Sequence, residues 1–275
     1  MREDDVQNDD MDDEEDEEDL PEFELTELTH QKNDRQTGHN GEIFIQERFI
    51  ADLAEIVAFA NKEHRSLSIE QCVLKNVRVH AATINIFFED SIFIEKAQFD
   101  DALFPQKLAF WETSFGKEAE FGRTIFKGDV SFEECLFQSG VNLAGALFEK
   151  KAAFTACDFE GDAIFDNARF AGGVDFSDST FRAKFSCLDT QFEKSVDLAN
   201  TTFEQAPETT GSNLEKAQEA EEADLERPKK PYRKKPKKRA EFNPWRQLDR
   251  ASKKTMTRRH LLRGLFRFLP KDKEE

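Results

Sequence analysis

The sequence predicts an all-β repeat solenoid over residues 67–205. Phenylalanine recurs at every eleventh position from Phe93 to Phe203 without exception. A second, mostly aromatic series is offset from the first by six residues and runs from Phe99 to Leu198. A small or apolar residue stands two positions before each member, and residues i−2 and i face the same side only in an extended strand. Each unit is therefore predicted to be a very short strand whose aromatic side chain points inward.

An eleven-residue period is also that of a helical coiled coil with about 3.67 residues per turn. At about 100° per residue, however, the two aromatic series and their small partners would spread around the whole helix instead of forming one stripe. The eight glycines between Gly116 and Gly173 would each weaken such a helix further. The pattern therefore favours strands.

Two stretches, AGALFEKKAAFTACDFEGDAIFDNARF and GGVDFSDSTFRAKF, show this pattern in a form that resembles the pentapeptide-repeat proteins. The match is to their Phe-rich variant with alternating spacings of five and six, and it covers residues 67–205. The resemblance implies a right-handed quadrilateral β-helix, in which four units make a coil of about 22 residues. Roughly six to seven coils, spaced by about 4.8 Å, would give a rod about 30 Å long.

The solenoid is predicted to begin with a coil of strict five-residue units. Its inward pairs are Leu67/Ile69, Cys72/Leu74, Val77/Val79 and Ala82/Ile84. A shorter step at residues 85–88 then joins this coil to the Phe-rich region. At Phe185 and Cys187 the large and the small residue exchange places, which keeps the volume of the pair roughly constant, as a close-packed core requires.

Residues 41–66 are predicted to form an amphipathic capping helix. Its apolar residues recur at helical spacing: Phe49, Ile50, Leu53, Ile56, Val57 and Ala60. The first coil of a solenoid exposes unpaired strand edges and needs such a cap. A partner-binding helix is the alternative interpretation of this segment.

Charge divides the rest of the chain, whose net charge is −18. Residues 1–40 carry a net charge of −14 and are predicted to be a disordered acidic tail. Residues 206–243 form a charged linker whose basic segment suits nucleic acid, an anionic membrane or an acidic protein. A weak second cap is the alternative interpretation of LEKAQEAEEADLE, residues 214–226. Residues 244–270 follow as a basic amphipathic helix. Neither a secretory signal nor a long apolar run is present, and a soluble, cytoplasmic protein is expected.

Two groups of residues are candidates for binding a partner. Steps of 22 residues from Asp90 give Glu112, Glu134, Ala156 and Asp178, a column in which four of five positions are acidic. A chance alignment in an acidic rod is the alternative explanation. The second group lies in the C-terminal part: Lys229, Lys230, Arg233, Lys234, Lys235, Lys237, Lys238, Arg239, Trp245, Arg258 and Arg259.

The sequence carries no recognisable catalytic motif. Its five histidines are scattered, and neither a glycine-rich phosphate loop nor a nucleophile elbow occurs. The four cysteines fall on inward positions, as small buried side chains would, and no cofactor or metal is expected.

These observations predict a non-enzymatic scaffold that binds a protein partner. Nucleic acid or an anionic membrane could bind through residues 227–269, and a homodimer could form through an end of the solenoid. The resemblance implies an alternative function, since some pentapeptide-repeat proteins mimic a DNA duplex and modulate type II topoisomerases. The net charge of −10 over residues 66–205 is compatible with such mimicry, whereas the basic C-terminal part opposes it.

Overall fold

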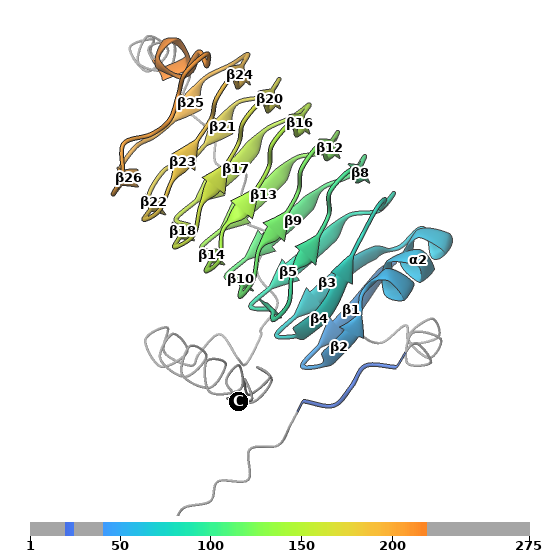
Figure 1. The fold of residues 1–275 in the computed structure, drawn as a ribbon. Helices are drawn as coiled ribbons and strands as arrows, with labels where there is room; N and C mark the ends of the chain where they lie inside the picture. The colour runs from blue at the N-terminus through green and yellow to red at the C-terminus, as the bar shows by residue number, and fades with distance from the viewer. Residues whose placement is uncertain (1–19, 25–40, 219–275) are drawn as a thin grey trace, which may run out of the picture.

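The chain winds into about seven stacked coils in the computed structural model, which describes residues 20–24 and 41–218 (Figure 1). Each full coil contributes one short strand to each of four faces. All strand pairs within a face are parallel, and most join residues 22 positions apart, such as Phe115 and Phe137. The predicted all-β solenoid is confirmed.

The four faces are numbered in chain order. Face 1 contains β1 (Glu42–Gln46), β3 (Ser66–Glu70), β5 (Ile86–Glu89), β9 (Leu108–Trp111), β13 (Val130–Glu133), β17 (Ala152–Thr155), β21 (Val174–Asp175) and β25 (Val196–Asp197). Face 2 contains β2 (Phe49–Asp52), β4 (Val73–Arg78), β6 (Ile92–Phe93), β10 (Ser114–Phe115), β14 (Leu136–Phe137), β18 (Asp158–Phe159), β22 (Thr180–Phe181) and β26 (Thr202–Phe203).

The other two faces have shorter strands. Face 3 contains the second half of β4 and then β7 (Ala97–Gln98), β11 (Ala119–Glu120), β15 (Val141–Asn142), β19 (Ala163–Ile164) and β23 (Phe185–Ser186). Face 4 contains β8 (Leu103–Phe104), β12 (Ile125–Phe126), β16 (Leu147–Phe148), β20 (Arg169–Phe170) and β24 (Gln191–Phe192). β4 turns the corner between faces 2 and 3 and pairs on both of them.

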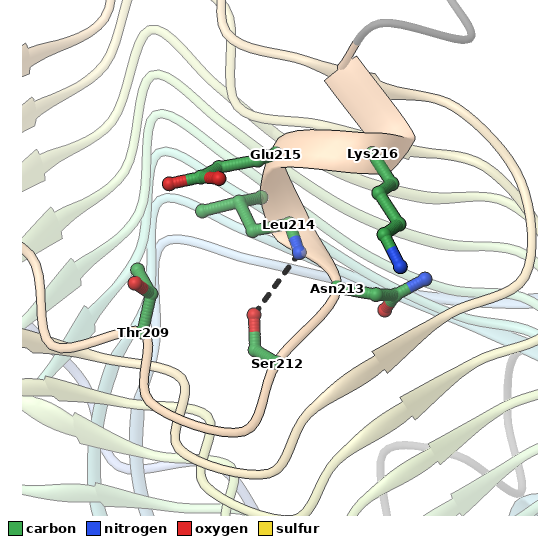
Figure 2. A pocket seen from close by; sticks show the side chains of 6 residues that line it. All are labelled: Thr209, Ser212, Asn213, Leu214, Glu215 and Lys216. Carbon is green, nitrogen blue, oxygen red and sulfur yellow. Dashed lines mark hydrogen bonds between the residues drawn. The ribbon is translucent and has the colours of Figure 1, made fainter.

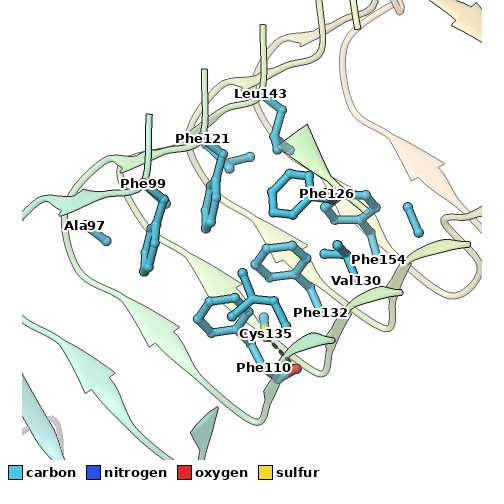
Figure 3. Close-up of a cluster of buried hydrophobic side chains, with 14 of the residues drawn as sticks. Ala97, Phe99, Phe110, Phe121, Phe126, Val130, Phe132, Cys135, Leu143 and Phe154 are labelled. Carbon is cyan, nitrogen blue, oxygen red and sulfur yellow. Dashed lines mark hydrogen bonds between the residues drawn. The ribbon is translucent and has the colours of Figure 1, made fainter. Parts of the chain in front are cut away.

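The interior consists of columns of phenylalanine rings (Figure 3). Along a column, rings on successive coils stack face to face, as Phe99 does on Phe121 with centroids 4.7 Å apart and planes 2° apart. Between columns the rings meet edge to face, as Phe121 and Phe132 do at 5.5 Å and 83°. The exchanged pair Phe185 and Cys187 is buried as well. The aromatic periodicity therefore does form the core.

The small residues at position i−2 also form hydrogen bonds that the sequence pattern did not reveal. Several of their hydroxyl groups donate to the backbone carbonyl of an aromatic residue on the preceding coil. Thr124 Oγ1 lies 2.6 Å from Phe99 O, Ser179 Oγ 2.6 Å from Phe154 O, and Thr190 Oγ1 2.7 Å from Phe165 O. Position i−2 thus requires a small residue, and in several coils this residue also donates a hydrogen bond.

We expect Thr124→Val to lower the free energy of unfolding by about 0.5–1.5 kcal/mol, because Thr124 is fully buried and its hydroxyl bond to Phe99 would be lost. Thr180→Val is the matched control, since Thr180 points outward on β22 and should change stability by no more than about 0.5 kcal/mol. Urea unfolding of both variants measures the difference. Equal effects would show that the hydroxyl column contributes nothing.

The N-terminal end differs from the prediction of a helix over residues 41–66. Residues 42–52 form β1 and β2, and the helix α2 is shorter, Ala54–Glu63. β1 pairs in register with β3, and Ile43 and Ile45 form an inward pair of the repeat type. The solenoid therefore begins at residue 42 and not at residue 67. The prediction failed because the apolar spacing from residue 49 to residue 60 fits a helix as a whole, although only its second half is helical.

α2 occupies the place of faces 3 and 4 in this first coil and covers the next coil (Figure 1). The side chain of Asn61 makes this junction: its Oδ1 accepts from the backbone N–H of Thr83 at 2.8 Å, and its Nδ2 donates to Ala81 O at 3.2 Å. Beside β2, Phe23 N donates to Phe49 O at 2.8 Å, so part of the predicted disordered tail is an ordered edge segment. Residues 1–19 and 25–40 lie outside the described residues.

The C-terminal end is closed beyond residue 205, where the sequence left a weak second cap and a charged linker as alternatives. Glu208 forms a bridge with Ser186, and a helical turn begins at Leu214. The side chain of Asn213 replaces a missing strand, because its Oδ1 accepts from Phe192 N and its Nδ2 donates to Phe192 O, both at 2.8 Å. Residues 208–218 thereby cover the last strands of faces 3 and 4.

Candidate interaction surface

The acidic column predicted from the sequence lies at one corner of the solenoid, between faces 1 and 2. Asp90, Glu112, Glu134 and Asp178 each follow a strand of face 1 and precede a strand of face 2. All four have a left-handed backbone with φ between 48° and 59°, as does Ala156 in the same column. Their backbone N–H groups bond to the next coil; Glu112 N, for example, donates to Glu133 O at 2.9 Å.

A left-handed backbone is unfavourable for most residues with a Cβ atom and is best tolerated by glycine, asparagine and aspartate. Glutamate occupies it at positions 112 and 134. The corner therefore holds glutamates where the backbone alone would favour other residues.

The adjacent column on face 1 adds more negative charge. Steps along the registered strands lead from Glu70 to Glu89, Trp111 and Glu133. The candidate residues predicted from the sequence did not include this column, although the same 22-residue step connects its last three members. Glu47 adds a further left-handed corner residue in the first coil. The acidic corner is defined here as Glu47, Glu70, Glu89, Asp90, Glu112, Glu133 and Glu134.

Trp111 stands within the acidic corner and is one of three large apolar side chains exposed in the described residues. It is 44% exposed. An indole ring can accept a cation on its face, and such contacts contribute about 0.5–1 kcal/mol at exposed sites. The corner thus combines stacked carboxylates with one aromatic surface.

The solenoid surface also contains pairs of opposite charges that join successive coils. Arg182 pairs with Asp158 at 2.7 Å and with Glu204 at 3.4 Å. Arg123 donates two hydrogen bonds to Asp101 at 2.6 and 2.7 Å, and this contact holds the pKa of the Asp101 carboxyl below its ordinary value. Further pairs are Lys96–Glu120, Lys151–Asp175, Arg169–Glu193 and Lys184–Glu208.

Comparison with protein families agrees with this architecture. A family model described as "Pentapeptide repeats (9 copies)" matches residues 110–158, which span strands β9 to β18. These residues are therefore similar to pentapeptide repeats. No curated protein and no solved structure matches the chain.

The four cysteines of the solenoid belong to its core. All four are buried and unbridged, and burial raises the pKa of the Cys72 thiol to about 11. Burial also raises the pKa of Cys157 well above its ordinary value, and its Sγ lies 3.3 Å from Phe132 O, in the same geometry as the hydroxyl donors. Thiols held protonated in this way are poor nucleophiles and poor metal ligands.

Two open hollows lie on the described part of the solenoid. One lies at the C-terminal end and has a volume of about 190 Å³, less than the roughly 300–1,000 Å³ of small-molecule sites (Figure 2). Its lining residues are Thr209, Ser212, Asn213, Leu214, Glu215 and Lys216. A second hollow, beside the start of α2, has a volume of about 410 Å³ and is open and lined by opposite charges, among them Asp52, Arg78, Glu95 and Lys96. Neither resembles the mostly apolar clefts that hold small ligands.

The remaining candidate features concern metals, membranes and the basic C-terminal part. Within residues 20–24 and 41–218, no three His, Cys, Asp or Glu side chains are grouped as metal ligands. No helix of that part is long and apolar enough to cross a bilayer. The predicted basic candidates, from Lys229 to Arg259, lie outside the described residues, so the structure brings together only the acidic candidates.

Proposed function

We propose that this repeat scaffold binds a basic protein partner along its acidic corner and that it does so without catalysing a reaction. The observation that carries the proposal is the stacking of carboxylates at one corner of the solenoid, around the exposed ring of Trp111. A cytoplasmic location is part of the proposal, because four unbridged cysteines suit a reducing compartment.

The geometry favours an extended, positively charged partner. Successive coils place the corner carboxylates about 4.8 Å apart, which is within the screening length of about 8 Å at physiological salt. Their potentials therefore add along the corner and can attract a polycation from a distance. Lysine and arginine side chains spaced along a strand or helix would each meet a carboxylate, and an arginine could also stack on Trp111.

DNA mimicry toward a type II topoisomerase is the second candidate. The regular spacing of Asp90, Glu112 and Glu134 supports it, because a duplex also presents evenly spaced negative charges. A duplex carries such charges along two strands, whereas the acidic residues Asp101 and Asp189 of the second left-handed corner are separated by Arg123, Gly145 and Asn167. We therefore rank DNA mimicry below the binding of a basic protein along a single corner. Competition with DNA for a purified type II topoisomerase would distinguish the two functions.

A pull-down with matched charge variants tests the proposed function. The full-length protein is compared with Glu112→Gln/Glu134→Gln and with the control Glu118→Gln/Glu149→Gln, which removes the same charge from exposed positions elsewhere. We expect a basic protein to be captured by the wild-type protein and the control but lost with the corner variant, and to elute as salt rises. Capture of the same proteins by all three would contradict the proposed site.

A further inference from the structure

An apolar column runs along the outside of face 2, directly beside the acidic corner. The residues between the inward pairs point outward by strand alternation, and here they are Phe49, Val73, Ile92, Ser114 and Leu136 in registered succession. Ile92 is buried and the others are half-buried. Ser114 is the one polar member of this column, and the next position is charged: it is Asp158, which pairs with Arg182.

The two flanks of this column differ in charge. The flank toward face 1 is the acidic corner, with Asp90, Glu112 and Glu134. The flank toward face 3 is mixed in charge, with Lys75 3.9 Å from Glu95 and with the exposed Lys117 next to the exposed Glu118. A ligand matched to this surface would have an apolar face bordered by positive charge on one side only.

We propose that residues 258–270 of this same chain, within the basic amphipathic helix predicted over 244–270, dock on the apolar column of face 2. At 100° per residue, Leu262, Leu265, Phe266 and Leu269 fall within about 100° of one another around such a helix. Arg259, Arg263 and Arg267 form an i, i+4, i+8 row along one flank of that apolar arc. The row can face the acidic corner while the leucines lie on the column.

The length of the apolar column agrees with the length of the predicted helix. Four coil-to-coil steps from Phe49 to Leu136, at about 4.8 Å each, make the column about 19 Å long. Thirteen helical residues at 1.5 Å per residue span about 20 Å. The predicted helix and the column therefore match in length as well as in charge.

The chain can reach this surface. The number of residues from 219 to 243 is 25, and a flexible chain of that length spans about 25–30 Å root-mean-square. The coil of β26 lies four steps, or about 19 Å, from the coil of β10 on face 2. Docking within one chain is thus geometrically accessible, and it would cover the acidic corner that the proposed function assigns to a partner. The inference rests on that function in this one respect.

A single tryptophan on the docking segment provides the test. The full-length protein carries Phe266→Trp as a reporter, with Trp111→Phe and Trp245→Phe to remove its two native tryptophans. Leu136→Lys is then compared with Leu147→Lys, which occupies the equivalent outward position on face 4 of the same coil and is also half-buried. Leu136→Lys should lower the docked-to-free ratio at least about tenfold. The emission of the reporter tryptophan should then move to longer wavelength, and its quenching by acrylamide should increase. Leu147→Lys should change neither quantity.

An unchanged spectrum in both variants, or equal changes in both, would overturn the docking site. A signal that disappears on dilution would overturn docking within one chain. Far-UV circular dichroism confirms that each variant is folded, and Glu112→Lys/Glu134→Lys provides a second, electrostatic way to release the segment.

A further variant separates this inference from the proposed function. Arg259→Gln/Arg263→Gln/Arg267→Gln should increase capture of poly-L-lysine by the full-length protein several-fold, because the segment no longer competes for the corner. If the reporter tryptophan does not respond while the corner variant still loses its partner, docking is wrong and the proposed function stands. If the reporter responds but no partner depends on the corner, the proposed function is wrong and the corner serves only this segment.

Discussion

We expect Phe137→Ala to lower the free energy of unfolding by about 3–5 kcal/mol. Phe137 is fully buried, and its ring stacks between Phe115 and Phe159 with centroids 4.8 and 4.9 Å away and planes 1° apart. Removing it leaves a cavity with aromatic walls on two sides. Because it lies in a middle coil, the neighbouring coils are held from both directions and cannot collapse into the space.

Phe87→Ala is the matched control for this variant. Phe87 points outward on β5, is only half-buried and lies under the Nζ of Lys107 at 5.8 Å from the ring centroid. Its truncation should cost no more than about 1 kcal/mol, the size of an exposed cation–π contact. Chemical denaturation followed by circular dichroism measures both. A loss below about 1 kcal/mol for Phe137→Ala would show that the column does not hold the coils together.

The repeat region was predictable because one physical requirement recurs in every coil. An inward ring at i and a small inward residue at i−2 produce a periodic pattern in the sequence. Even the exchanged residues Phe185 and Cys187 fill the two inward positions of this pattern. The hydrogen-bonding role of that small residue was not predictable from size, since alanine at position 146 and threonine at position 124 occupy equivalent places in the repeat.

The two ends were not predictable because their structure does not repeat. Ile43 and Ile45 are a single inward pair, and the helical spacing that follows them concealed their role. At the other end, the side chain of Asn213 takes the hydrogen-bonding role of a strand, which no local propensity signals. Closure of a solenoid depends on how individual side chains meet the last strands, and periodicity carries no information on that.

The acidic column was predicted as a column, and part of its surroundings was predicted with it. Spacing by 22 residues aligned Glu112 with Glu134 and Trp111 with Glu133, yet only the fold shows that the apolar column of face 2 lies beside them. The corner is also set by the left-handed backbone, which arises from the coil geometry and which glutamate does not prefer.

We expect Gly128→Ala to be the next most damaging change, costing about 1–3 kcal/mol or more. A Cβ atom at this position would lie 2.2 Å from the carbonyl oxygen of Gln106 and 2.3 Å from its carbon, on the preceding coil. These are backbone atoms in a registered stack, so the clash is relieved only by separating coils.

At Gly122 a Cβ atom would be 3.7 Å from Ala144 O, an ordinary contact. Gly122→Ala should therefore be neutral or stabilise by about 0.4–1 kcal/mol through the unfolded chain. Thermal unfolding of both variants decides, and equal effects would mean that the coils are not in van der Waals contact at residue 128.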